Sequence, residues 1–225
     1  MATFLLRVWV PDRPGALGAV ASRIGAVRGD LIGIDILERG AGRAIDELVV
    51  ELPNEDLVPL LVSEVSEVDG VDVEDVRPAL SSVVDPRLDA LETAAFLVDQ
   101  LSVPELLEAL ARRSSRDFQA DWAVVLDLEA ASAVAQVGTA PPAAWLRAFV
   151  AGSRASAAPG DLGGPDDMAW AELGAADLVV LLGRRGRPFR ARERRQLSAL
   201  ARIVDQRWMD LVTRSARMLH PSATP

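Results

Sequence analysis

The sequence predicts an α+β protein of two domains, each an antiparallel sheet packed against helices. Three observations predict this class. A length of 225 residues fits two domains of roughly 80 and 130 residues. The first third alternates strand and helix periodicities, and the remainder places helical patterns on both sides of a group of short strands. Half of the residues are hydrophobic, so each domain has enough apolar side chains for a core.

The first domain, residues 1–78, has the element order strand, helix, strand, strand, helix, strand, which is the ferredoxin-like βαββαβ arrangement. The predicted strands are 4–10, 32–36, 48–52 and 71–76, and the predicted helices are 17–27 and 55–68. We expect Gly29 to take a left-handed conformation after the first helix and Asn54 to cap the second. The helix-facing strand residues are expected to be Leu6, Val8, Ile34, Leu48 and Val50, and Leu57, Leu60, Leu61, Val65 and Val68 to form the buried face of the second helix.

The opposite face of this sheet is predicted to be too apolar for full solvation. It carries Leu5, Trp9, Leu31, Leu37, Ile45 and Val49, with Arg7, Asp35, Glu47 and Glu51 among them. We expect the second domain or another chain to cover it.

The turn after the first strand is the most informative motif. It reads Asp12-Arg13-Pro14-Gly15-Ala16-Leu17 before an amphipathic helix, and Gly29–Ile34 leads into the second strand. Over about residues 3–78 the chain resembles the ACT domain, a small-molecule regulatory module. This resemblance implies an amino-acid-sized ligand, bound where the first strand–helix loop of one subunit faces the second strand of another. It implies the ligand-binding residues Asp12, Arg13, Gly15, Ala16, Leu17, Ile32 and Gly33.

The physical chemistry of the turn fits that role. The N–H groups of Gly15, Ala16 and Leu17 would lie unpaired at a helix N-terminus, where a carboxylate can bind. Gly15 would let a ligand approach the backbone, and Asp12 could accept an ammonium group. The structural alternative is that Asp12 caps the helix and Gly15 eases the turn.

Residues 79–87 are predicted to be a linker, and residues 88–215 a second domain followed by a flexible tail, 216–225. Ser102, Pro104 and Glu105 predict a helix start of the capping-box type. We expect helices at 88–101, 102–111, 142–150 and 197–212, strands at 122–126, 133–137, 168–173 and 177–182, and a mobile loop at 152–167.

Over about residues 88–212 this order resembles a GAF-like domain. The resemblance is carried by Leu178–Gly183, then Arg187-Pro188-Phe189, then Glu193 and the last helix. It implies an antiparallel sheet flanked by helices. The usual hydroxyl residue after the Phe is replaced by Arg190.

Composition restricts the chemistry. The chain has no Cys, Lys or Tyr, and the single His220 lies near the C-terminus. Thiolate, Schiff-base and phenolic catalysis are excluded. We therefore expect no enzyme activity, no catalytic residue, no metal and no cofactor. A catalyst would have to use carboxylates such as Asp166 and Asp167, although adjacent acids in a Gly/Pro-rich loop are usually only solvated.

Charge argues against nucleic acid as a partner. The formal net charge is −9 and the pI is about 4.7, so phosphate is repelled. Seven arginines between Arg184 and Arg195 form a local exception. They could contact a phosphate or RNA, or they could be a solvated hairpin end and first helical turn.

The sequence thus predicts a non-enzymatic regulatory protein that senses a small molecule of the amino-acid class and forms a homodimer. An alternative is an adaptor without a ligand, with the apolar sheet face and the terminal helices binding a protein partner. No segment has the length of a membrane span, and the N-terminus reads as a strand and not a signal peptide, so we expect a cytoplasmic protein without membrane contact. Abundant Arg without Lys indicates a high-GC, bacterial genome.

Overall fold

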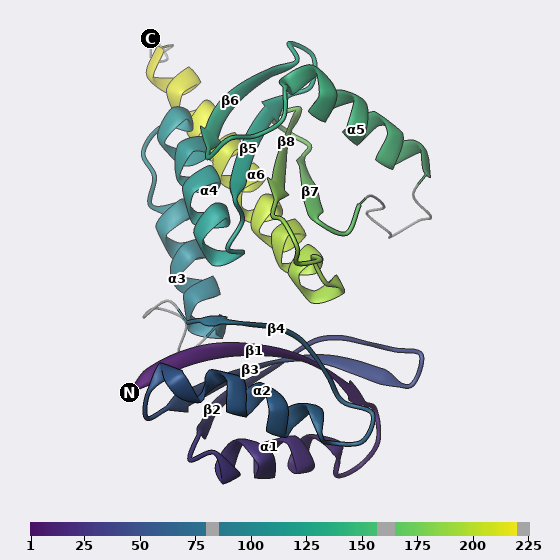
Figure 1. Ribbon diagram of the computed structural model, residues 1–225. Coiled ribbons are helices and arrows are strands. Elements are labelled where there is room, and N and C mark those ends of the chain that lie inside the picture. Colours follow the sequence, from purple (N-terminus) through teal and green to yellow (C-terminus); the bar gives the residue numbers. More distant parts are fainter. Residues whose placement is uncertain (80–85, 157–164, 220–225) are drawn as a thin grey trace. The chain divides into compact units, whose positions relative to one another are not determined.

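The computed structural model describes residues 1–79, 86–156 and 165–219. Contacts divide the chain into two compact units, Met1–Asp89 and Ala90–Pro225, and each is described by itself (Figure 1). Both units contain a four-stranded antiparallel sheet with helices, so the predicted α+β class is confirmed.

The first unit has the βαββαβ order that the sequence predicts. Its strands pair antiparallel in the order β2-β3-β1-β4, and Figure 1 shows both helices on one face of this sheet. The elements are β1 (Ala2–Pro11), α1 (Ala16–Ala26), β2 (Asp30–Gly40), β3 (Arg43–Leu52), a 3-10 turn η1 (Glu55–Leu57), α2 (Val58–Ser66) and β4 (Asp72–Pro78).

The core of this unit lies between the sheet and the two helices. Alternate residues of the two central strands, β1 and β3, point into it, as the period-two pattern predicts. Its buried side chains include Phe4, Leu6, Val8, Val10, Leu48, Val50, Leu52, Val20, Ile24, Leu61 and Val65.

Two predicted positions are wrong, and a third is more exposed than expected. Leu60 on α2, which we expected to be buried, is 47% exposed. Leu31 packs against the helix-side core and not on the opposite face, because a register shift between Leu31 and Gly33 inserts Ile32 as an extra residue and interrupts the alternation of the strand. Ile34 pairs with Leu48 and so lies on the helix side, as predicted, but it is 47% exposed because β2 is an edge strand.

Two helix boundaries also differ from expectation. The left-handed residue after α1 is Arg28 (φ 61°) and not Gly29. Gly29 is required for space, because a Cβ there would lie 2.9 Å from Ile24 Cγ2 and 3.1 Å from Leu52 Cδ2. Asn54 precedes η1 and its side chain makes no capping hydrogen bond, so α2 begins later than predicted, at Val58.

The sheet face opposite the helices carries an ion-pair network. Glu47 Oε2 accepts hydrogen bonds from Arg7 NH2 and Arg77 NH2, each at 2.8 Å, and Arg77 NH1 donates to Asp75 Oδ2 at 2.6 Å. Trp9 Nε1 donates to Glu74 Oε2 at 2.7 Å. Arg7 is 1% exposed and as buried as Leu5, Ile45, Val49 and Leu37, whereas its partners Glu47 and Glu74 are 16% and 15% exposed.

The second unit is built on the strand order β6-β5-β8-β7, all antiparallel. The first helix of this part begins at Pro86, within the segment that we assigned to the linker. The elements are α3 (Pro86–Val98), α4 (Val103–Asp117), β5 (Trp122–Asp127), β6 (Ser132–Val137), α5 (Ala143–Ser156), β7 (Met168–Leu173), β8 (Leu178–Gly183) and α6 (Ala191–Leu219).

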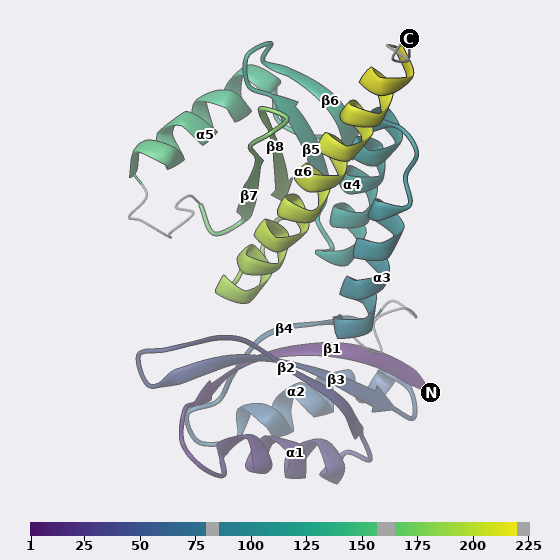
Figure 2. The same ribbon diagram turned by 180° about the vertical axis from the view of Figure 1, so that it is seen from behind.

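Helices cover both faces of this second sheet (Figure 2). Ala123 and Val125 of β5 point into a core shared with α4 and α6, whereas Val124 and Leu126 point into a core shared with α5. The capping-box start of α4 is confirmed, since Ser102 Oγ accepts a hydrogen bond from the Glu105 N–H at 3.3 Å.

Parts of two predicted segments fall outside the described residues. The expected mobile loop at 152–167 is helical up to Ser156, and 157–164 are not described. The tail predicted from residue 216 begins as helix, because α6 extends to Leu219, and 220–225 with His220 are not described. None of the helices in the described ranges combines the length and apolar character that a membrane span requires.

Candidate functional site

The predicted ligand site is the turn between β1 and α1. The Asp12 N–H donates to the Gly42 carbonyl at 2.9 Å, which ties the turn to the β2–β3 hairpin. Gly15 is the N-cap residue of α1 with φ 86°, a conformation that favours glycine. A Cβ on Gly15 would meet no atom within 4 Å, so the space above the turn is open.

Asp12 does not cap the helix. The N-cap of α1 receives no side-chain hydrogen bond, and the Asp12 carboxylate is exposed with no hydrogen-bond partner among the described residues. The structural alternative for Asp12 is therefore wrong, whereas the conformational role of Gly15 holds.

The free N–H groups are fewer than predicted. Ala16 N–H donates to the Arg13 carbonyl at 3.3 Å, so it is not available. Within the part of the chain that the structure describes, the N–H groups of Gly15 and Leu17 have no acceptor. Arg13 makes an exposed ion pair of 3.5 Å with Asp69, and such a pair contributes little to stability.

Ile32 and Gly33 do not join this turn within one copy of the chain. The turn is hydrogen-bonded to the hairpin that follows Gly40, and Ile32 lies eight residues earlier on β2, roughly 26 Å away along an extended strand. Gly33 is needed for packing, because a Cβ would lie 2.9 Å from Val49 Cγ2. Ile32 is 38% exposed. A site that uses all seven predicted residues needs two copies.

Asp46 is a residue that the sequence analysis missed. It pairs with Val8 and Ile36, which places it on the helix side of β3. It is 4% exposed, and its Oδ1 has no hydrogen-bond partner among the described residues. Burial raises the pKa of Asp46, Arg39 lowers it in part, and Asp12 raises it further, so Asp46 interacts electrostatically with the turn. The signal in the sequence was a carboxylate in phase with Leu48 and Val50.

We expect Asp46→Asn to raise the free energy of unfolding at pH 7 by about 1 kcal/mol, because a neutral amide replaces a buried, incompletely hydrogen-bonded carboxylate. Since the folded-state pKa is raised, Asp46 stabilises the fold below its ordinary pKa of 3.8 and loses that contribution as pH rises through the folded value. The difference between variant and parent should therefore grow from pH 3 to pH 7 in urea titrations. Asp56→Asn, which removes an exposed carboxylate in η1 that does not influence Asp46, is the control. An Asp46→Asn protein less stable than its parent at pH 7 would contradict this account.

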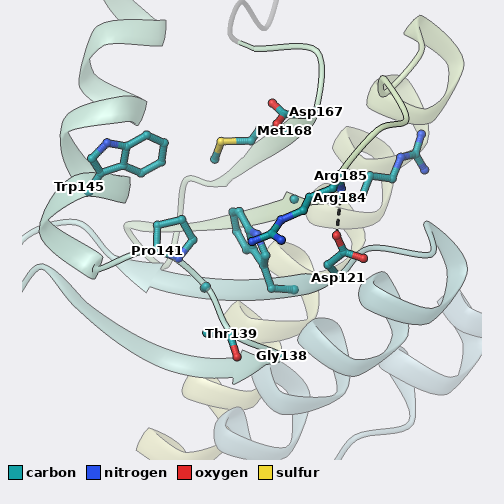
Figure 3. A pocket seen from close by; sticks show the side chains of 12 residues that line it. Asp121, Gly138, Thr139, Pro141, Trp145, Asp167, Met168, Arg184 and Arg185 are labelled. Atoms are coloured by element: carbon teal, nitrogen blue, oxygen red, sulfur yellow. Dashed lines mark hydrogen bonds between the residues drawn. The ribbon is translucent and has the colours of Figure 1, made fainter.

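A pocket of about 880 Å³ lies at one end of the second sheet. Figure 3 shows Trp145 and Pro141 on one side of it and Asp167 and Asp121 on the other. Its lining residues are Asp121, Trp122, Gly138, Thr139, Ala140, Pro141, Trp145, Asp167, Met168, Gly183, Arg184 and Arg185. The sequence analysis did not predict this pocket, because its residues come from four strand ends and one helix.

Two arginines of the cluster at 184–195 have a structural role that neither predicted reading included. Arg184 is 3% exposed, and its guanidinium donates to the carbonyls of Phe118 (2.7 Å), Arg187 (3.0 Å) and Pro188 (2.9 Å) and to Glu193 (2.8 Å). Arg187 donates to the side-chain and backbone oxygens of Gln119. These two side chains hold the segment before α6 in place, whereas Arg185 and Arg195 are exposed, as the solvated reading expects.

No metal site is indicated in the described ranges, where no three His, Asp or Glu side chains gather in a way that could hold an ion. Asp166 and Asp167 are both exposed. Their backbone carbonyls accept hydrogen bonds from Phe189 and Arg184.

Among known proteins, only solved structures show a likeness to this chain, and those described here cover less than half of it. No family model and no curated protein matches. Solved structures with some likeness include the ACT domain from GTP pyrophosphokinase of Chlorobium tepidum, at 18% identity and a TM-score of 0.29, with 35% of this chain and 97% of that chain covered. An unknown protein from Galdieria sulphuraria has 16% identity and a TM-score of 0.32, over 43% of this chain and 62% of that one.

A formyltetrahydrofolate deformylase from Pseudomonas putida KT2440 has 14% identity and a TM-score of 0.30, over 42% of this chain and 38% of that one. The neighbours thus include an ACT domain. Scores this low carry no argument about activity, and no GAF domain is among these three.

Proposed function

We propose that the first unit is a regulatory module that binds a small zwitterion of the amino-acid class at the β1–α1 turn, without enzymatic activity, in a soluble cytoplasmic protein. The observation that carries the proposal is the free Asp12 carboxylate. It caps no helix, and it lies in the same turn as the Gly15 and Leu17 N–H groups, which have no acceptor among the described residues.

The ligand class follows from this pairing. Helix N-terminal N–H groups attract a carboxylate, and an exposed Asp attracts an ammonium group. An amino acid carries both groups one carbon apart. In the proposed homodimer, the turn of one copy faces Ile32 and Gly33 of the other, which would bring the two halves of the predicted site together.

We expect Asp12→Ala to weaken amino-acid binding by tenfold or more, since a charge-assisted hydrogen bond contributes about 1.5–3 kcal/mol. The ligand is first found by a thermal-shift screen of the amino acids on the full chain, and its affinity is then measured by calorimetry. Because Asp12 makes no cap, the stability of the variant without ligand should equal that of the parent within about 0.5 kcal/mol.

The matched control is Asp56→Ala, which removes an exposed carboxylate in η1, away from the turn. Equal amino-acid affinity in Asp12→Ala and the parent would mean that the ligand does not bind at the β1–α1 turn. No stabilisation by any amino acid would favour the adaptor alternative. Light scattering that gives a monomer mass at tens of micromolar would reject the shared site.

A further inference from the structure

The pocket at the end of the second sheet is assembled from all four strands. Gly138 follows β6, Trp122 begins β5, Gly183 ends β8 and Met168 begins β7. Trp122 and Met168 both pair with Gly183, so the three form one row across the sheet. Trp145, in the first turn of α5, lines the same pocket and lies near Met168 in Figure 3.

Glycine at position 183 leaves room for the indole ring of Trp122 within this row. A Cβ on Gly183 would lie 2.2 Å from Cε2 and Cζ2 of Trp122, so only glycine lets the Trp122 ring lie against the strand. Gly138 has φ 71°, and a Cβ there would lie 2.2 Å from the Asp121 carbonyl, so this segment also needs glycine to pass close to β5. The two glycines bring the Trp122 ring and residues 138–141 together as pocket walls.

The facing wall is aromatic and accessible. Trp145 is 49% exposed, and its ring is stacked on Phe149 with a centroid distance of 5.8 Å and an interplanar angle of 5°. By contrast, Trp170 in the core beneath is 3% exposed. Trp122, Trp145 and Pro141 therefore offer flat surfaces that favour a ring between them, and the largely buried Met168 lines the pocket beside them.

The rim carries the exposed carboxylates of Asp121 and Asp167 and the exposed guanidinium of Arg185. The Arg185 N–H is held by Asp121 Oδ2 at 2.9 Å, and the Asp167 carbonyl accepts from Arg184 N–H at 3.0 Å, so both backbones are fixed. The charged ends of Arg185 and Asp167 are exposed and have no ion pair in the described ranges. Arg184 is directed to Glu193 and backbone carbonyls and contributes no free charge.

We propose that this pocket binds an aromatic zwitterion, of the size and class of an aromatic amino acid. The ring lies between Trp145 and the Trp122–Met168 row, the ligand carboxylate pairs with the Arg185 guanidinium, and the ligand ammonium pairs with the Asp167 carboxylate. A pocket of this volume accommodates such a ligand. The inference is independent of the function proposed for the first unit, because no residue is shared.

The test is calorimetric titration of the full chain with L-phenylalanine in an Asp12→Ala background, which removes the proposed site of the first unit. Three analogues each lack one group: 3-phenylpropanoate has no ammonium, 2-phenylethylamine has no carboxylate and L-alanine has no ring. We expect each to bind at least tenfold more weakly than L-phenylalanine. Tryptophan fluorescence should change with the ring-bearing ligand at the same midpoint.

The variants test each contact. Arg185→Gln, Asp167→Asn and Trp145→Ala should each weaken L-phenylalanine binding by roughly tenfold or more. Arg202→Gln, an exposed arginine of α6 that does not line this pocket, should leave it unchanged. Absence of heat and of a fluorescence change with L-phenylalanine up to about 10 mM would overturn the proposal, as would equal affinity in Arg185→Gln or equal binding of L-alanine.

Discussion

Replacing Glu47 by Gln is expected to lower the free energy of unfolding of the first unit by about 3–5 kcal/mol at pH 7. Glu47 Oε2 accepts from both Arg7 and Arg77, and Arg7 is 1% exposed. Gln can still accept a hydrogen bond, but it leaves two guanidinium groups without their shared counter-charge. One of these is fully desolvated, which makes the loss large.

The pH dependence gives this prediction a second readout. Burial raises the pKa of Glu47, but Arg77 and Arg7 outweigh burial, so the pKa lies below its ordinary value of 4.5. Glu47 therefore contributes its stabilisation above pH 4.5 and loses it as pH falls through the folded-state pKa. The difference in the free energy of unfolding between parent and Glu47→Gln should narrow on acidification, as measured by urea unfolding of the full chain at a series of pH values.

Glu51→Gln is the matched control, since Glu51 lies on the same strand and makes no ion pair within the described part of the chain. Glu51→Gln should change the free energy of unfolding by no more than about 0.5 kcal/mol. A Glu47→Gln protein as stable as Glu51→Gln at pH 7 would mean that the network does not stabilise the fold.

Replacing Arg184 by Met is expected to have the second large effect. It should lower the free energy of unfolding of the second unit by about 3–5 kcal/mol. The guanidinium satisfies three backbone carbonyls and Glu193 in a buried position, and its Cζ lies 4.0 Å from the Phe189 ring centroid. Met fills part of the volume but leaves these acceptors without a donor. Arg184→Lys should regain little of the stability that Arg184→Met loses, because one ammonium group cannot reach four acceptors in fixed directions.

The neighbouring Arg185→Gln provides the control, because it removes the same charge from an exposed side chain. Guanidinium chloride titrations of the three proteins measure the effect. If Arg184→Met and Arg185→Gln unfold at the same midpoint, the arginine cluster is a solvated surface after all.

Elements with strong local periodicity could be predicted from the sequence. Alternation in β1 and β3, helical spacing in α4 and α6 and the Ser102 cap depend on neighbours within about four residues, and the sequence predicts these elements in the right places. The ends of the helices are less well predicted, because α4 extends to Asp117 and α6 begins at Ala191. The element order then led to the ferredoxin-like arrangement.

Features that depend on contacts between residues far apart in the chain could not be predicted from the sequence. The extra residue at Ile32 depends on pairing with β3, and Arg184 is buried because it reaches Phe118, 66 residues earlier. Asp46 lies in an inward position without a partner to identify it. In the candidate site, Asp12 and Gly15 were placed together by their proximity in the chain, whereas Ile32 and Gly33 depend on a second copy.

The edge strand β2 has a consequence for handling the protein. Ile32, Ile34 and Ile36 are each at least 37% exposed along an 11-residue edge, and no described strand pairs with its outer side. Such an edge can template intermolecular sheet formation. Asp30, Asp35 and Glu38 lie on the same strand. The net charge of the whole chain vanishes near the pI of about 4.7, so repulsion between molecules and colloidal stability should be lowest at that pH, and concentrated stocks should be kept well above it.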